Sequence, residues 1–152
     1  MRPLLVLAGV AVVAVAAFVL AYFEPQKLFI DDRVSEAAPS AAAQTLSSGA
    51  FRSYEHSTHG RARVIAAPDG RRYVRFEDFS TSNGPALKVY LSAARATGPG
   101  DSFDDRFVDL GDLKGNIGPQ NYAIPRAVRL DRYRSVVVWC KRFSVPFAAA
   151  AL

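Results

Sequence analysis

An uninterrupted apolar run near the start of the chain limits what this sequence can fold into more than any other feature. Residues 4–23 read LLVLAGVAVVAVAAFVLAYF and contain no charged residue. As an α-helix such a run is about 30 Å long, which matches the hydrocarbon core of a bilayer. The helix of a soluble protein would show a polar face, and this run has none. The sequence therefore predicts one transmembrane helix, with residues 1–23 as an N-terminal membrane anchor.

The end of the run favours a permanent anchor over a cleaved secretory signal. A signal peptide has a shorter apolar stretch followed by small residues at the cleavage site. Here the run ends in AYFEP at residues 21–25, where two aromatic residues and a proline make a poor cleavage site. A lipoprotein anchor is excluded because the only cysteine is Cys140. We expect a signal-anchor, and a cleaved signal is the alternative.

The charges that flank the run indicate its orientation. Arg2 and the amino terminus precede it, and Lys27 and Arg33 follow it among several acidic residues. Because a first, signal-like helix places its N-terminus in the cytoplasm, we expect a single-pass protein of the cell membrane with an extracytoplasmic C-terminal domain. The net charge of +5 would attract anionic lipids or polymers, or simply keep the domain soluble. No nucleic-acid recognition motif is present, so we expect no nucleic-acid partner.

Composition divides the rest of the chain into a connecting segment and a domain. Residues 24–48 form a juxtamembrane segment and linker, and residues 35–48 (SEAAPSAAAQTLSS) contain no aromatic residue. Such a segment buries too little surface to become ordered by itself. The folded domain is expected to cover residues 49–152.

The domain shows a series of short strand patterns separated by turn residues. Residues 61–79 predict a hairpin around Pro68-Asp69-Gly70, and residues 95–106 are expected to be a flexible excursion. The predicted strands are residues 51–56, 61–67, 71–79, 87–91, 107–110, 120–124, 135–140 and 145–152, the last of which could instead be an apolar tail. Seven or eight short strands indicate an all-β antiparallel sandwich or barrel.

No hydrolytic motif, phosphate-binding loop or covalent haem-attachment motif occurs, so we expect no stand-alone enzyme. The remaining candidate is Cys140, the last residue of a strand that is apolar on both faces and hence central. It could be a small core residue, because free cysteines are among the most buried residues. It could instead be a redox thiol or a ligand to haem or metal, because an unpaired thiol is unusual outside the cytoplasm.

Two histidines and two turn residues are weaker candidates. His56 and His59 would lie on opposite faces of a strand, so joint metal ligation needs a turn between them. His56 alone could lie near Cys140, which only the fold decides. Asp78 and Asn83 are expected to hydrogen-bond the turn backbone rather than a ligand.

Five segments together resemble the DM-thirteen family of electron-transfer domains. They are DFSTSNGP (residues 78–85), LKVYLS (87–92), DLGDLKG (109–115), QNYAIP (120–125) and YRSVVVWC (133–140). They occur in the family's order and cover about residues 47–152. The stretch KLFIDDRV before them also resembles the juxtamembrane part of bacterial, membrane-anchored members.

The resemblance implies a β-rich domain whose signature cysteine matches Cys140, and His56 also matches a recurrent family position. It implies redox chemistry through a bare thiol or through a bound group such as haem. The chain departs from the family at Ala86, where members usually carry Asp, and at Ala148, where many carry Gly.

Two functions follow as expectations. One is a membrane-tethered redox module that uses Cys140, with His56 as a possible co-ligand and a redox or envelope protein as partner. The alternative is a non-catalytic binding or structural module of the cell envelope in which Cys140 is a core residue.

Overall fold

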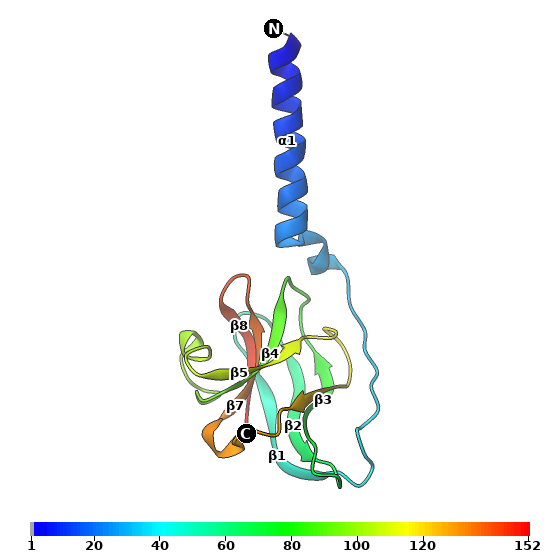
Figure 1. Cartoon of the computed structure of the whole chain (residues 1–152), viewed down its shortest axis with the longest axis vertical. Helices are drawn as coiled ribbons and strands as arrows, with labels where there is room; N and C mark the ends of the chain where they lie inside the picture. The colour runs from blue at the N-terminus through cyan, green and yellow to red at the C-terminus, as the bar shows by residue number, and fades with distance from the viewer. Residues whose placement is uncertain (1) are drawn as a thin grey trace.

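A long apolar helix and a β-barrel make up the molecule, and the helix projects from one end of the barrel (Figure 1). The computed structural model describes residues 2–152, apart from the side chains of Arg2, Leu4, Leu28 and Phe29. Helix α1 (Arg2–Phe23) contains an apolar stretch, Leu5–Phe23, none of which is buried against the rest of the protein. The helix ends where Glu24 adopts a left-handed backbone (φ 46°), and a short 3₁₀ turn, η1 (Pro25–Phe29), follows. The predicted long N-terminal apolar helix is confirmed.

The barrel is a single eight-stranded antiparallel sheet that is nearly closed. Its strands are β1 (Gln44–Ser53), β2 (His59–Ala66), β3 (Arg72–Ser80), β4 (Leu87–Ser92), β5 (Phe107–Asp112), β6 (Gln120–Ile124), β7 (Ser135–Cys140) and β8 (Val145–Ala151). The order across the sheet is β5-β4-β7-β8-β1-β2-β3-β6, and the edge strands β5 and β6 approach each other. The all-β prediction is confirmed, the barrel form included, and residues 145–151 are a strand rather than a tail.

The side chains alternate between the inside and the outside of the barrel, as the period of a strand requires. Phe51, Phe76 and Phe79 lie in the main core, with ring centroids 4.8 to 5.2 Å apart. The opposite face of β7 carries Val137 and Trp139 into a second cluster. These two clusters explain why the five residues from Val136 to Cys140 are all buried.

The second cluster also orders the connection between β4 and β5. Phe103 is fully buried there, with its ring edge-to-face at 5.2 Å from Tyr54. The Tyr54 hydroxyl lies 2.8 and 2.7 Å from the carbonyl oxygens of Ala96 and Gly98. The expectation of a flexible excursion over residues 95–106 was therefore wrong, because one aromatic side chain fixes this connection to the barrel.

The segment after the helix runs along the barrel to its far end before β1 begins (Figure 1). We call residues 30–37 the strap. Arg33 forms a parallel bridge with Ile117, and the Val34 and Glu36 amides each donate 2.9 Å hydrogen bonds, to Ile117 O and Pro119 O. The strap is thus ordered by backbone pairing with the β5–β6 connection and not by apolar burial. The expectation that residues 35–48 stay unordered fails at Glu36, and β1 begins at Gln44.

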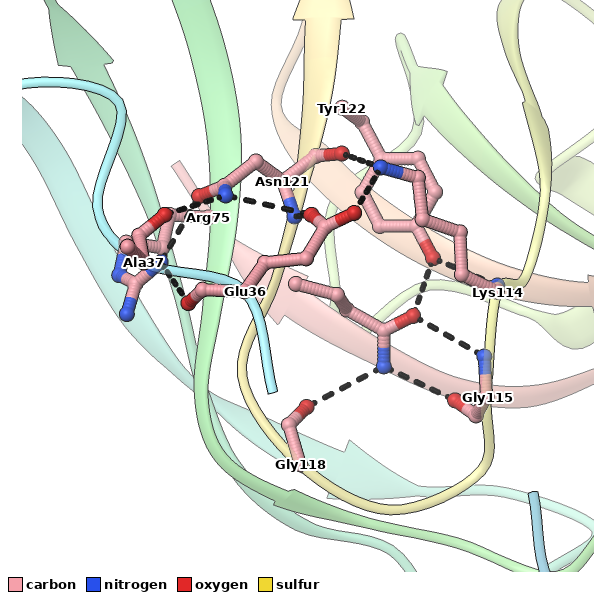
Figure 2. A network of polar contacts seen from close by, with 9 residues as sticks. Glu36, Ala37, Arg75, Lys114, Gly115, Gly118, Asn121 and Tyr122 are labelled. Carbon is pink, nitrogen blue, oxygen red and sulfur yellow. Dashed lines mark hydrogen bonds and ion pairs between the residues drawn. The ribbon is translucent and has the colours of Figure 1, made fainter. Parts of the chain in front are cut away.

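Glu36 fixes the end of the strap through charged hydrogen bonds (Figure 2). Its carboxylate accepts from Lys114 Nζ at 2.6 Å and from the Asn121 amide at 2.7 Å. Burial would raise the pKa of Glu36, but the hydrogen bonds from Lys114 and Asn121 and the Lys114 charge together lower it below its usual value. Beneath this contact Gln120 is fully buried and accepts a 2.5 Å hydrogen bond from the Tyr122 hydroxyl. The strap therefore depends on an ionised carboxylate.

Candidate functional site

Cys140 ends β7 on its inward face, at the end of the barrel nearest α1. It pairs with Leu87 of β4 and with Val145 of β8, and it belongs to the main core with Val136 and Val138. The exposed fraction of Cys140 is 0%. Its thiol donates a 3.3 Å hydrogen bond to the carbonyl oxygen of Pro85. The sequence correctly predicted a central, buried strand, and the thiol is satisfied within it.

A short loop, residues 83–86, covers the thiol. Asn83 accepts a 2.9 Å hydrogen bond from the Gly84 amide, so its side chain shapes the turn as predicted. Ala86 has a left-handed backbone (φ 52°), and its carbonyl oxygen accepts from the Lys141 amide at 3.1 Å. A Cβ atom at Gly84 would come within 3.0 Å of the Phe147 ring. The loop therefore packs closely on β7 and β8 directly over Cys140.

A small polar cavity of about 110 Å³ borders the same loop. Gly84, Ala86 and Leu87 form one side of it, and Cys140 itself does not line it. Its polar lining comes from Lys27, Asp32, Asn83, Asp112 and Asn116. The cavity and the thiol thus share the loop 83–86, while their atoms stay separate.

The charges of this cavity are largely neutralised by pairing. Asp112 lies 2.7 Å from Lys88 Nζ, and this hydrogen bond raises the pKa of Lys88 although burial opposes it. Lys27 pairs with Glu24 at 3.1 Å. Asp32 is the exception among the charged residues that line the cavity, because its carboxylate accepts a hydrogen bond from Asn83 and has no cationic partner among the described residues.

Among the described residues, neither histidine makes a hydrogen bond with the Cys140 thiol, whose partner is Pro85 O. His56 lies in a bend between β1 and β2, and its ring packs on Phe147 with centroids 3.8 Å apart. His59 starts β2 and is exposed. Phe147 in turn contacts Gly84, so aromatic and backbone atoms connect the imidazole to the loop that covers the thiol. Across residues 2–152 no three His, Cys, Asp or Glu side chains cluster as metal ligands do.

The surroundings of Cys140 do not fit a haem. Pockets that hold ligands of that size have volumes of about 300 Å³ or more. The cavity beside loop 83–86 has about 110 Å³, and Cys140 does not line it. The residues present therefore suit a bare thiol better than an iron ligand.

The contacts that join the strap to this end of the barrel gave no signal in the sequence. Asn83 Nδ2 donates at 2.9 Å to both Ile30 O and Asp32 Oδ2 of the strap. Asn116 Nδ2 donates at 2.9 Å to Asp31 Oδ1, and its own oxygen accepts from the Asp32 amide at 2.7 Å. The prediction that Asn83 bonds its own turn is confirmed, but the contact with the strap was missed. These pairs are 51 to 85 residues apart in the chain, so no local pattern indicates them.

Comparison with known proteins gives one match. The model of the family described as Electron transfer DM13 matches residues 50–152. No curated protein matches the chain, and no solved structure matches it. The matched residues include all of β2 to β8, loop 83–86 and Cys140.

Proposed function

Because the chain belongs to the Electron transfer DM13 family, we propose that it is a membrane-tethered electron-transfer module whose redox group is the Cys140 thiol. The observation that carries the proposal is the position of this thiol. It is the only one in the chain, and a four-residue loop that borders a cavity covers it. The domain would be extracytoplasmic, as in the bacterial, membrane-anchored type that the juxtamembrane stretch resembles.

The tether is supported by the form of α1. The stretch Leu5–Phe23 is long enough to cross a bilayer and buries none of its side chains in the protein. Tyr22 and Phe23 lie at its end, where aromatic rings settle at the membrane interface. An uncleaved helix with a cytoplasmic N-terminus would hold the barrel at the outer membrane surface.

Electron transfer by a single thiol requires a partner that has a disulfide. The Cys140 thiolate would attack one sulfur of the partner, forming a mixed disulfide while the second partner sulfur leaves as a thiolate. A dithiol donor would then attack the Cys140 sulfur of the mixed disulfide and release the partner as a dithiol. The second thiol of the donor would displace Cys140 as a thiolate and leave the donor as a disulfide, so that two electrons pass from the donor to the partner through the domain. Because the thiol is buried, loop 83–86 must open first, which breaks the Cys140–Pro85 hydrogen bond.

The burial of the sulfur also supports a second function, a non-catalytic binding or structural module of the envelope. In that case Cys140 is a core residue like Val138 beside it, and both are 0% exposed. The two functions differ in one measurable property. Only the redox module needs Cys140 to react while the barrel stays folded.

The test is the rate of thiol modification in the folded, full-length protein. The chain in detergent or vesicles is treated with excess maleimide, and the labelling rate is compared with the rate of global unfolding. The redox proposal predicts labelling far faster than unfolding, at a rate that hardly changes in mild denaturant because the opening is local. Labelling that proceeds only at the global unfolding rate would exclude it and support the structural function.

A matched variant separates access to the thiol from stability of the fold. Val138→Ala lies on the same face of the same strand and weakens the same core, but leaves loop 83–86 intact. It should accelerate labelling only as far as it accelerates unfolding.

The absorption spectrum and metal content of the protein as purified would show whether the sulfur is a ligand instead.

A further inference from the structure

We propose that the tip of the β7–β8 hairpin, residues 141–144, lies in the headgroup layer of the membrane and binds anionic phospholipids. The proposal rests on the membrane tether proposed above. It adds a second membrane contact, made by the barrel itself. We call residues 141–144 the hairpin tip.

Direct contacts place the hairpin tip level with the end of α1. The rings of Phe143 and Phe23 stack with centroids 6.1 Å apart. The Arg142 guanidinium lies over the Tyr22 ring at 3.8 Å, and its Nη1 donates a hydrogen bond to the Tyr22 carbonyl oxygen. Because Tyr22 and Phe23 end the apolar span, the hairpin tip lies at the depth where the hydrocarbon core gives way to headgroups.

The side chains of the hairpin tip suit that layer. Phe143 is 52% exposed although it is a large apolar residue. Lys141 and Arg142 directly precede it, and among the described residues neither has an acidic partner within ion-pair distance. An exposed aromatic ring next to two cations is the combination that enters the boundary of acyl chains and anionic headgroups. The occupant of this surface is therefore the lipid layer.

The opposite end of the barrel provides an internal comparison. Phe107 is also exposed, at 39%, and it pairs with Ser92, at the end of β4 that lies away from Leu87 and Cys140. Arg95, Arg106, Arg132 and Arg134 line a hollow there of about 420 Å³. That end is at least as basic as the hairpin tip, but it lies far from α1. Net charge alone therefore does not distinguish the two ends, and position relative to the helix does.

Docking of the hairpin tip would orient the proposed redox site. Cys140 directly precedes the hairpin tip, and the Ala86 carbonyl of the covering loop accepts from the Lys141 amide. Loop 83–86 would then open at the membrane surface. A partner reaching the thiol would approach along the bilayer rather than from the far end of the barrel.

The experiment uses the full chain in vesicles of phosphatidylcholine and phosphatidylglycerol whose acyl chains are brominated near the headgroup. Bromine quenches tryptophan at short range, and the native Trp139, which is buried, gives the baseline. Three variants each add one tryptophan: Phe143→Trp at the hairpin tip, Phe107→Trp at the far end and Phe18→Trp within the span. We expect strong added quenching for Phe143→Trp and Phe18→Trp, and none for Phe107→Trp.

Each outcome bears on a different claim. If Phe18→Trp is quenched and Phe143→Trp is not, the tether is supported and the docking proposal is overturned. The exposed hairpin tip would then be a surface for a protein partner instead of lipid. If Phe18→Trp also escapes quenching, the tether itself fails. The failure of the inference can thus be told from the failure of the proposed function.

Charge reversal tests the lipid chemistry. Near an anionic membrane each cation changes binding by about fivefold. Lys141→Glu with Arg142→Glu should therefore abolish the Phe143→Trp quenching in these vesicles, and high salt should weaken it. Arg106→Glu with Arg134→Glu makes the same change in net charge at the far end and should leave the quenching unchanged. If both double variants lose the Phe143→Trp quenching to the same extent, specific docking of the hairpin tip is overturned.

Discussion

Ala86 has an unusual backbone conformation for a residue with a Cβ atom. Its φ of 52° lies in the left-handed region, which costs a residue with a Cβ atom about 1–2 kcal/mol. Asn and Asp tolerate this region better than Ala, because their short polar side chains can bond locally. The loop over Cys140 therefore contains backbone strain at Ala86.

Replacing Ala86 by Gly should relieve that strain. We expect Ala86→Gly to raise the free energy of unfolding by about 1 kcal/mol, measured by urea denaturation. The control is Ala123→Gly on strand β6, which should lower stability because strand positions disfavour Gly. If Ala86→Gly is as destabilising as the control, Ala86 is not strained.

Removing the sulfur should have a moderate cost. We expect Cys140→Ser to lower the free energy of unfolding by about 1–3 kcal/mol, because a hydroxyl is more costly to bury than a thiol. The Pro85 carbonyl would still accept its hydrogen bond and keep the cost at the low end. Thermal denaturation measures the change, and a loss beyond that of Val138→Ala would show that the site cannot accept the smaller polar atom.

The placement of single residues was predictable only where a strand pattern fixed it. Cys140 could be assigned to a central strand because apolar residues fill both faces of residues 135–140. His56 could not be placed, because its position depends on a bend and on Phe147, which is 91 residues later. Asn83 gave a turn signal but no indication that it holds the strap.

The strap shows how an element without a periodic pattern becomes ordered. Its backbone passes so close to the β5–β6 connection that a Cβ atom at Gly118 would lie 1.9 Å from Val34 O. Strands could be predicted from the period of two, whereas the strap pairs only with a loop that is distant in sequence. Most strands were therefore predictable and the strap was not.

Gly118 tests the docking of the strap. Gly118→Ala combines the cost of a positive φ with a collision against the strap, whereas Gly111→Ala, at a similar φ, meets open space. Both should lose about 1–2 kcal/mol from the backbone. We expect Gly118→Ala also to increase hydrogen exchange at the Val34 and Glu36 amides, with no such change in Gly111→Ala.

Glu36 should make the strap sensitive to acid. Because its folded pKa is lowered, its contribution is present above the ordinary carboxyl pKa of about 4.3 and is lost as pH falls through the lower folded value. The protection factors of the strap amides, which correct for the slower intrinsic exchange in acid, should therefore fall below about pH 4.3.

The matched variants are Glu36→Gln and Glu55→Gln. Glu36→Gln should show faster exchange at neutral pH and little further change in acid. Glu55 is an exposed carboxylate of the β1–β2 connection, and its replacement should leave the acid response of the strap unchanged. A strap that stays protected in acid would argue against the role of Glu36.

For the whole molecule, two properties of the anchor decide the proposed tether: whether residues 1–23 stay on the mature protein, and on which side of the membrane the barrel lies. We expect the intact mass of the protein from membranes to include residues 1–23, because the sequence after Phe23 is a poor cleavage site. Protease added to intact cells should digest the barrel. A mature chain that begins shortly after Phe23 would make the helix a cleaved signal and remove the tether.

The sheet order has a consequence for biosynthesis. Strand β8 follows all the other strands in the chain, yet it lies inside the sheet, between β7 and β1. While the chain is being made, β1 to β3 can form a meander early, but they cannot join β4, β5 and β7 until β8 emerges. Until the last strand arrives the barrel has an open seam, and its unpaired strand edges are prone to aggregate.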